Sequence, residues 1–319
     1  MIKLDRPTVK TGQAAYCYEW VEHWARIPEG AQSRTNGRTH GIAISANGQV
    51  IVFHQANPAV LLFDAHGNLM KSWGDRFLGA HGLTLVQEGG EEFLWLTDQY
   101  SGEVVKTTIE GQTIMNLGVP DLPVYKGGKF SPTWVAVYEE RFGGNGDIWV
   151  ADGYGRHQVH RYNKKGEYLS SISGREGNVG AFRCPHGIWI DTRSVEPELY
   201  VADRSNHCVQ VYGLDGKFKY SFGHGIVYSP CGFTPYGEFL IIPEIHARVA
   251  VLDTQKNLVC YLGENVLIVD EEGWPDLPEK LVQPGRFVSP HSVAVDQEGN
   301  LYIVEWMVGG RITKLVREK

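Results

Sequence analysis

Three histidines recur at a constant interval along the chain, and imidazole is a common metal ligand. His81, His186 and His291 follow one another at intervals of 105 residues, in the segments Ala-His-Gly-Leu, Pro-His-Gly-Ile and Pro-His-Ser-Val. Each of them opens an apolar-alternating stretch that ends in a turn. Three neutral imidazoles that converge on one point form a ligand set of the zinc type, with a position left open for a substrate. The spacing therefore predicts a metal centre, provided that the fold brings the three residues together.

A repeated unit runs from about residue 40 to the end of the chain. It opens with a histidine or a small residue and continues with short strands of alternating polarity, separated by Gly, Asn and Asp turns. Copies begin near residues 40, 81, 134, 186, 231 and 291, at intervals of 41 to 60 residues. Three apolar strands and a more polar fourth strand per copy are typical of propeller blades. Six copies predict an all-β protein with the architecture of a six-bladed β-propeller.

The two ends of the chain complement each other. The sixth copy ends after its third strand, whereas residues 16–27 form a strand-like stretch outside the repeat. We expect this stretch to be the outer strand of the last blade, which would close the ring and remove exposed sheet edges. Residues 1–319 then form a single domain. A separate N-terminal domain is the alternative, but about 35 residues rarely fold alone. Residues 263–287 are expected to form a long loop over one face.

The first strand of each propeller blade lines the central channel. We call the residue that opens this strand the axial residue. The predicted axial residues of the six copies are His40, His81, Trp134, His186, Cys231 and His291. Alternate blades of a six-bladed ring are about 120° apart, so three of these histidines would point at the axis in threefold register. A single such histidine would more often bind a neighbouring blade, and Cys231 is expected to be a small core residue.

Further residues are predicted to surround the same cavity. Tyr154 and Arg204 lie just after the aspartates that end the second strands of the third and fourth copies, and they interrupt the repeat. We therefore predict a catalytic role for both, whereas Asp98, Asp152 and Asp203 recur regularly and should cap turns. The predicted substrate-binding residues are His40, His54, Gln55, Trp134 and Glu305.

Bulk composition narrows the function. A net charge of −7 disfavours nucleic acids and anionic membranes as partners, since both require a basic face. No apolar run is long enough to span a bilayer, and Met1–Arg6 lacks the apolar core of a signal peptide. The 5 cysteines form no CxxC pair, which favours free thiols in the cytoplasm. A small-molecule substrate is the partner we expect.

Taken together, these segments resemble the NHL-repeat propellers, and among them peptidyl-α-hydroxyglycine α-amidating lyase. The resemblance runs from about residue 40 to the C-terminus and is strongest in Ile51-Val-Phe-His, His81-Gly-Leu, Val201-Ala-Asp-Arg and Pro290-His. It implies that zinc is bound by three histidines of alternate blades, which match His81, His186 and His291. It also implies a site tyrosine at Tyr154 and a site arginine at Arg204.

Three departures from the family pattern qualify this resemblance. Gln55 stands where the family has an arginine that helps to bind the substrate carboxylate, and a glutamine has no charged fork. Ser292 stands where the family has an aspartate that binds calcium, so we do not expect calcium. Gly155 follows Tyr154 where the family has a disulfide cysteine. The resemblance therefore implies a cytosolic relative with a changed substrate.

The sequence thus favours a metal-dependent, lyase-like enzyme that acts on a small hydroxylated or carboxylate-bearing substrate. It would hold one divalent metal, with zinc first and iron or manganese also compatible. Tyr154 would serve as a general base or hydrogen-bond donor, and Arg204 would hold a carboxylate or an oxyanion. Two alternatives stay open: a non-catalytic NHL platform for a protein or peptide, and an enzyme of the sugar-lactone hydrolase type. Neither the substrate nor the oligomeric state follows from the sequence.

Overall fold

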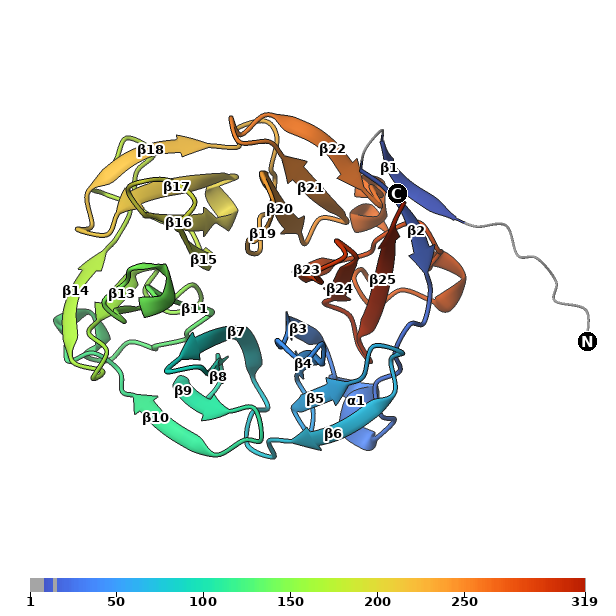
Figure 1. The fold of residues 1–319 in the computed structure, drawn as a ribbon, viewed down its shortest axis with the longest axis horizontal. Helices are drawn as coiled ribbons and strands as arrows, with labels where there is room; N and C mark the ends of the chain where they lie inside the picture. The colour runs from blue at the N-terminus through green and yellow to red at the C-terminus, as the bar shows by residue number, and fades with distance from the viewer. Residues whose placement is uncertain (1–8, 14–15, 319) are drawn as a thin grey trace, which may run out of the picture.

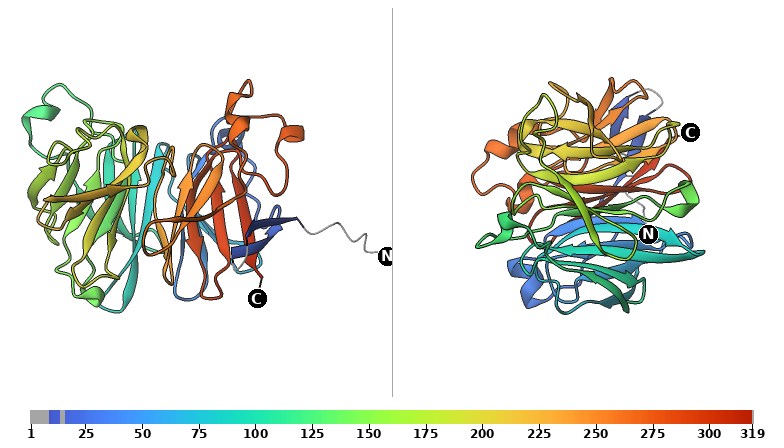
Figure 2. Two further views of the ribbon diagram at one scale, coloured as in Figure 1. Left: turned by 90° about the horizontal axis from the view of Figure 1, so that it is seen from above. Right: turned by 90° about the vertical axis from the view of Figure 1, so that its left-hand side faces the viewer.

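The computed structural model describes residues 9–13 and 16–318, whose strands form six antiparallel sheets around one axis (Figure 1). This confirms the predicted six-bladed β-propeller. In Figure 2 the strands run roughly along the axis of the ring, and a long segment before β23 projects from one face. Met1–Arg6, on which the prediction about a signal peptide rests, lie outside the described residues.

The first three blades each contain four strands in chain order. Blade 1 consists of β3 (Thr39–Ile44), β4 (Val50–His54), β5 (Val60–Phe63) and β6 (Leu69–Trp73). Blade 2 consists of β7 (Ala80–Glu88), β8 (Glu91–Asp98), β9 (Glu103–Thr108) and β10 (Thr113–Leu117). Blade 3 consists of β11 (Trp134–Val137), β12 (Ile148–Ala151), β13 (Val159–Tyr162) and β14 (Tyr168–Ile172).

Blades 4 and 5 follow the same order, and blade 6 joins the two ends of the chain. Blade 4 consists of β15 (Pro185–Asp191), β16 (Glu198–Asp203), β17 (Cys208–Gly213) and β18 (Phe218–Phe222). Blade 5 consists of β19 (Thr234–Tyr236), β20 (Phe239–Glu244), β21 (Arg248–Leu252) and β22 (Leu258–Leu262). Blade 6 consists of β23 (Pro290–Val295), β24 (Leu301–Glu305), β25 (Arg311–Arg317), β2 (Tyr16–Val21) and β1 (Lys10–Gln13).

Helices occur only in connections within the described residues. They are α1 (Ala31–Thr35) and the 3₁₀ turns η1 (Pro123–Tyr125), η2 (Glu140–Phe142), η3 (Arg204–Asn206), η4 (Val266–Asp270) and η5 (Glu279–Leu281). None of these helices has the length and hydropathy required to cross a bilayer. All 5 cysteines are free thiols, as the sequence predicts.

The hydrophobic core is divided among the contacts between neighbouring blades. Six apolar clusters are found, and each joins two adjacent sheets, as Phe53 and Leu96 do between blades 1 and 2. A second strand such as β4 is buried at every residue because its sheet is covered on both faces, whereas the outer strand β6 is mostly exposed. The apolar residues therefore fix the spacing of the blades, whereas polar side chains lie at the axis.

The N-terminal strand closes the ring. β2 pairs antiparallel with β25, with Tyr18 opposite Arg317 and Trp20 opposite Leu315, which confirms the predicted closing strand. The strand ends at Val21 rather than at residue 27, because the chain then turns and Trp24 packs edge-on against Tyr302, with ring centroids 4.9 Å apart. β1 adds a fifth strand outside it.

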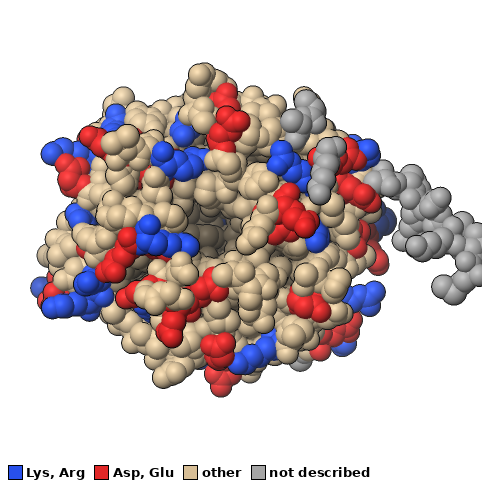
Figure 3. Space-filling view, in the orientation of Figure 1, with Lys and Arg blue, Asp and Glu red and all other residues tan. Residues whose placement is uncertain are grey.

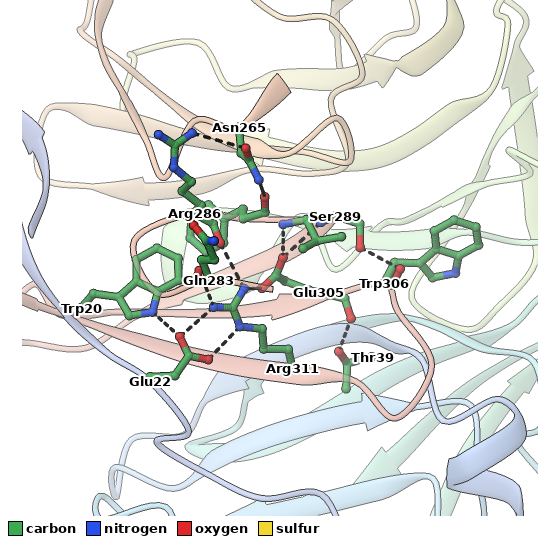
Figure 4. A network of polar contacts seen from close by, with 12 residues as sticks. Trp20, Glu22, Thr39, Asn265, Gln283, Arg286, Ser289, Glu305, Trp306 and Arg311 are labelled. Carbon is green, nitrogen blue, oxygen red and sulfur yellow. Dashed lines mark hydrogen bonds and ion pairs between the residues drawn. The ribbon is translucent and has the colours of Figure 1, made fainter. Parts of the chain in front are cut away.

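A buried ion-pair network links the closing strand to the last blade (Figure 4). Arg311 donates from Nε and Nη2 to the two carboxylate oxygens of Glu22, at 2.9 and 2.6 Å, and from Nη1 to Glu305 at 3.0 Å. Trp20 donates its indole N–H to Glu22 at 2.7 Å. Because Arg311 is flanked by two carboxylates, its burial leaves no unpaired charge.

Replacing Trp20 by alanine should lower the free energy of unfolding by about 3–5 kcal/mol, since a buried aromatic ring is removed. Trp20 packs against Phe287 with ring centroids 4.7 Å apart, and it lies under the guanidinium of Arg311. Chemical denaturation of the variant measures the effect. Met70→Ala on the exposed outer strand β6 is the control and should change stability by less than about 0.5 kcal/mol. Equal losses in the two variants would contradict the role assigned to the closing strand.

Candidate metal centre

The three predicted metal-binding histidines meet at the axis of the ring. The ring centroids of His81, His186 and His291 form a nearly equilateral triangle, with sides of 4.7, 4.8 and 4.9 Å. All three side chains are buried. Their strands come from blades 2, 4 and 6, so the constant interval in the sequence corresponds to alternate blades of the ring.

Each imidazole is oriented by a hydrogen bond to the next blade. Nδ1 of His81 donates to the carbonyl oxygen of Thr133 at 2.8 Å, and Nδ1 of His186 donates to that of Cys231 at 2.8 Å. Nδ1 of His291 donates to the carbonyl oxygen of His40 at 2.9 Å. A carbonyl can only accept, so each ring carries its proton on Nδ1 and presents a lone pair at Nε2.

The glycine after a site histidine allows this contact. A Cβ added at Gly82 would lie 2.4 Å from the carbonyl oxygen of Thr133, and one at Gly187 would lie 2.2 Å from that of Cys231. These are the two carbonyls that accept from His81 and His186. The His-Gly pairs in the sequence therefore combine a ligand with the close approach of the strand that orients it.

The Nε2 atoms form a donor set that fits a divalent metal ion. Nε2 of His186 lies 3.1 Å from Nε2 of His81, and neither nitrogen carries a proton to share. Nε2 of His291 is buried without a hydrogen-bond partner. The buried lone pair of His291 lacks a positive partner, and a divalent cation between the three rings would supply one. The residues present thus fit a metal held by three imidazoles.

Two further groups of potential ligands overlap with these three. His40, His81 and His291 offer ligand atoms that all lie within 4.8 Å of one another, and so do His186, Cys231 and His291. The Cys231 thiol is buried, and burial raises its pKa, so the group is neutral in this structure. Cys231 is buried, as predicted for a small core residue, and its neutral thiol lies beside the imidazoles of His186 and His291.

Tyr154 and Arg204 lie directly on the histidine cluster. The phenol oxygen of Tyr154 is 3.0 Å from Nε2 of His186 and 3.3 Å from Nε2 of His81. Arg204 donates from Nη1 to the Tyr154 oxygen at 2.9 Å and from Nη2 to Nε2 of His186 at 2.6 Å. The Nη2 contact uses the lone pair that a metal would need, so Arg204 and a metal exclude each other at this nitrogen.

Burial determines the protonation states in the cluster. It lowers the pKa of His81 to about 3 and lowers the pKa of His186 and His291 well below the usual value, so all three imidazoles are neutral at physiological pH. Burial also raises the pKa of Tyr154, and its phenol therefore keeps its proton. Arg204 is the permanent cation of the site, and its Nε is buried without a partner.

The acidic residues at the ends of the second strands hold the loops that lead to the axis. Asp152 accepts from the backbone N–H of Ser131 at 2.7 Å and of Arg156 at 2.6 Å, which fixes the turn that carries Tyr154. Asp203 accepts from the N–H of Arg183 at 2.8 Å. The aspartates are therefore structural, as the sequence analysis predicts.

Glu305 and His54 occupy the same structural position in blades 6 and 1, and the structure does not bring them to the cluster. The Glu305 carboxylate accepts from the N–H of Val288 and of Ser289, at 2.6 and 3.0 Å, and pairs with Arg311. Nε2 of His54 contacts the carbonyl oxygen of Pro58 at 2.5 Å. Both residues are predicted from the sequence to bind the substrate, but their polar groups are directed at loops instead.

Trp134 is not the axial residue of blade 3 that the sequence predicts, because that position lies one residue earlier. Val135 pairs with Val150, two residues before Asp152, whereas Leu83 pairs with Leu96, two residues before Asp98. The residue equivalent to His81 in blade 3 is therefore Thr133. A one-residue shift turns a side chain to the other side of a strand. Trp134 accordingly lines the channel that opens on the opposite face of the ring, together with Ser292.

Gln55 and His40 do line a cavity beside the cluster. It has a volume of about 360 Å³ and is bordered by Arg38, His40, Gln55, Gln99, Tyr100, Tyr154 and Trp306. The amide nitrogen of Gln55 is buried without a partner, so it is a free donor for a ligand. Tyr100 and Trp306 hold positions comparable to those of Tyr154 and Arg204, shortly after the end of a second strand, as the sequence indicates. The sequence does not single out Arg38 or Gln99. Gln99 follows the end of β8 as Gln55 follows the end of β4, which is the signal that could have identified it.

The long segment before β23 borders this cavity. Arg38 forms a two-pronged ion pair with Asp276 of this segment, at 2.8 and 2.6 Å, and lies over the ring of Trp306. The face that carries the cavity is thus the one from which the segment projects in Figure 2. Figure 3 shows that the ring is hollowed at its centre, with acidic and basic residues intermixed around it.

Comparison with known proteins agrees with the predicted resemblance. The human NHL repeat-containing protein 3 is 26% identical over 301 residues, an alignment that covers 88% of this chain and 79% of that protein. Peptidyl-alpha-hydroxyglycine alpha-amidating lyase 1 of Drosophila melanogaster is 27% identical, over 94% of this chain and 60% of that protein. This chain resembles the NHL-repeat proteins and the amidating lyases. No protein-family model matches it.

Solved structures support the fold. A streptogramin B lyase has a TM-score of 0.62 at 14% identity and covers 94% of this chain and 98% of its own. A gluconolactonase from Xanthomonas campestris has a TM-score of 0.64 at 15% identity and covers 98% of this chain and 96% of its own. At such identities the likeness extends to the propeller and not to the chemistry.

The stability of the metal-free protein should depend on His81 in acid. The pKa of His81 is about 3 in the folded state, against about 6.5 in an unfolded chain. Between these values the unfolded state binds one more proton, so stability is full above about pH 6.5 and decreases as the pH falls. Each such histidine contributes about 1.4 kcal/mol per pH unit to this slope.

His81→Gln removes the titrating group, so the variant should lose stability less steeply than the native chain. Urea unfolding of chelator-treated protein at pH 7.5, 6.5 and 5.5 measures the two slopes. The comparison concerns the slopes alone, because the substitution also changes the stability at neutral pH. Parallel curves would contradict the assignment of a buried, neutral His81.

Proposed function

We propose that this protein is a metal-dependent lyase that acts on a small, hydroxylated substrate carrying a carboxylate. The observation that carries the proposal is the convergence of the three imidazole rings with the Tyr154 phenol and the Arg204 guanidinium. This cluster lies beside a cavity that Tyr154 lines. His81, His186 and His291 would hold the metal. Their imidazoles favour zinc by ligand type, and iron and manganese are compatible. When bound, a divalent ion supplies Lewis acidity and lowers the pKa of a coordinated hydroxyl.

Charge supports an anionic substrate. The Arg204 guanidinium contacts Tyr154, His186 and Cys231, and no carboxylate pairs with it in the described part of the chain. Arg204 is half-buried, and its Nε is buried without a partner, so a bound carboxylate would supply the counter-ion that it lacks. When His186 gives its lone pair to a metal, Nη2 of Arg204 loses its acceptor and becomes available to such an anion. The free amide of Gln55 adds a neutral donor at the cavity wall.

Tyr154 is placed to move the proton. In the cleavage of a carbinolamide, the hydroxyl loses its proton, the C–N bond breaks and the nitrogen gains a proton. The Tyr154 phenol keeps its proton because burial raises its pKa, so it can donate to the departing nitrogen. The phenolate that results is stabilised by Nη1 of Arg204 and takes the proton of the hydroxyl as the carbonyl forms. One proton is thus transferred from the hydroxyl of the substrate to the nitrogen of the substrate through the Tyr154 oxygen.

Replacing His186 by alanine should remove both metal and turnover. The variant loses one of three ligands and the anchor at Cys231, so we expect metal content to fall from about one equivalent to below about one tenth, because three ligands define the site. Elemental analysis of purified protein and glyoxylate release from an N-acyl-α-hydroxyglycine are the two measurements. His66→Ala, an exposed histidine in a turn of blade 1, should keep the metal. Full activity of the His186 variant without metal would refute the proposal.

Replacing Gln55 by arginine should improve carboxylate binding. A charged donor in place of a neutral amide contributes about 1.4 kcal/mol or more, or at least about tenfold in kcat/KM, for N-acyl-α-hydroxyglycine. Steady-state kinetics of glyoxylate release measure the gain, and the corresponding amide without a carboxylate is the control substrate. A gain on both substrates, or on neither, would show that Gln55 does not face the carboxylate.

A further inference from the structure

A fourth imidazole belongs to the cluster at the axis. His40 opens the inner strand of blade 1, between the blades that carry His81 and His291. Its ring centroid lies 4.7 Å from that of His81 and 4.6 Å from that of His291, the same separations as among the three predicted ligands. Its side chain is equally buried, at 1% exposure.

His40 has a different anchor from the other three but also carries a lone pair on Nε2. Its Nδ1 faces the carbonyl oxygen of Arg38, two residues earlier in the chain, at 3.3 Å, so the proton lies on Nδ1. No hydrogen-bond partner is found for its Nε2 among residues 9–13 and 16–318. A ligand atom of His40 lies within 4.8 Å of one from His81 and one from His291.

The spacing of the nitrogens bears on the kind of metal. Two nitrogens bound at about 2.1 Å to one ion lie about 3.0 Å apart at a right angle and about 3.4 Å apart at the tetrahedral angle. Nε2 of His81 and Nε2 of His186 are 3.1 Å apart, a separation that one ion can span. Four imidazoles would moreover fill a tetrahedral zinc site and leave no position for a substrate. A five- or six-coordinate ion keeps at least one position open.

We propose that His40 is a fourth metal ligand and that the centre holds a five- or six-coordinate divalent ion such as Fe²⁺ or Mn²⁺. The proposal rests on the metal site assigned under the proposed function and adds one ligand to it. The remaining positions of the ion would face the cavity bordered by Gln55 and Tyr154, where a hydroxyl and a neighbouring carboxylate could bind side by side.

Cobalt titration of the chelator-treated, full-length protein tests this. Tetrahedral Co²⁺ absorbs visible light much more strongly than five- or six-coordinate Co²⁺, so we expect a weak spectrum from the native chain. His40→Ala should weaken Co²⁺ binding at least tenfold and strengthen the absorption as the coordination number falls. His224→Ala, an exposed histidine bound to Ser221, is the matched control and should change neither quantity.

The outcomes separate this proposal from the one on which it rests. An intense, tetrahedral spectrum of the native protein would overturn the five- or six-coordinate centre without the need for any variant, and this covers the case in which the His40 variant does not fold. Native affinity and an unchanged spectrum in a folded His40→Ala protein would overturn the fourth ligand. If His186→Ala abolishes Co²⁺ binding in that case, the three-histidine site stands. Absence of Co²⁺ binding to the native chain would overturn both proposals.

Discussion

Hydrogen bonds between neighbouring blades set the direction of the axial imidazoles. His81, His186 and His291 each give the Nδ1 proton to a backbone carbonyl of the next blade, so their Nε2 lone pairs must face the axis. Backbone carbonyls do not titrate or rotate away, unlike a carboxylate or a hydroxyl. The packing of neighbouring blades therefore determines both the protonation state and the orientation of these imidazoles. A change in the distance between two blades would alter both, because it would alter the hydrogen bond at Nδ1.

That distance is maintained far from the axis. The six apolar clusters lie between sheets, and the glycines after His81 and His186 allow neighbouring strands to approach at the axis. The acidic residues that end the second strands act at an intermediate radius, since Asp152 fixes the turn of Tyr154 by accepting backbone N–H groups. Apolar packing between the sheets, the capped turns and the histidine cluster are therefore in contact from the rim of the ring to its axis. Such contacts hold the side chains of the site in place before a substrate binds, as a preorganised site requires.

The sequence predicts the ring and the convergence of three histidines because both follow from regular spacing. It also predicts Tyr154 and Arg204, which break the repeat and lie on the cluster. It fails where a side chain's direction depends on a partner far along the chain: Glu305 is directed at Ser289 and Arg311. Trp134 is misplaced by one residue, because the register shifts beside Ala80 and Pro185 cannot be recognised from apolar alternation alone.

The closure of the last blade also has a consequence for the timing of assembly. β2 precedes the strands of the other five blades in the chain and β25 follows them, yet the two pair in one sheet. The anchor of His291 is the carbonyl of His40, so this contact too joins an early and a late part of the chain. During synthesis the nascent chain therefore carries its histidines without a completed centre. Closure of the ring, and with it the anchor of His291, therefore waits until the strands of all the other blades have been synthesised.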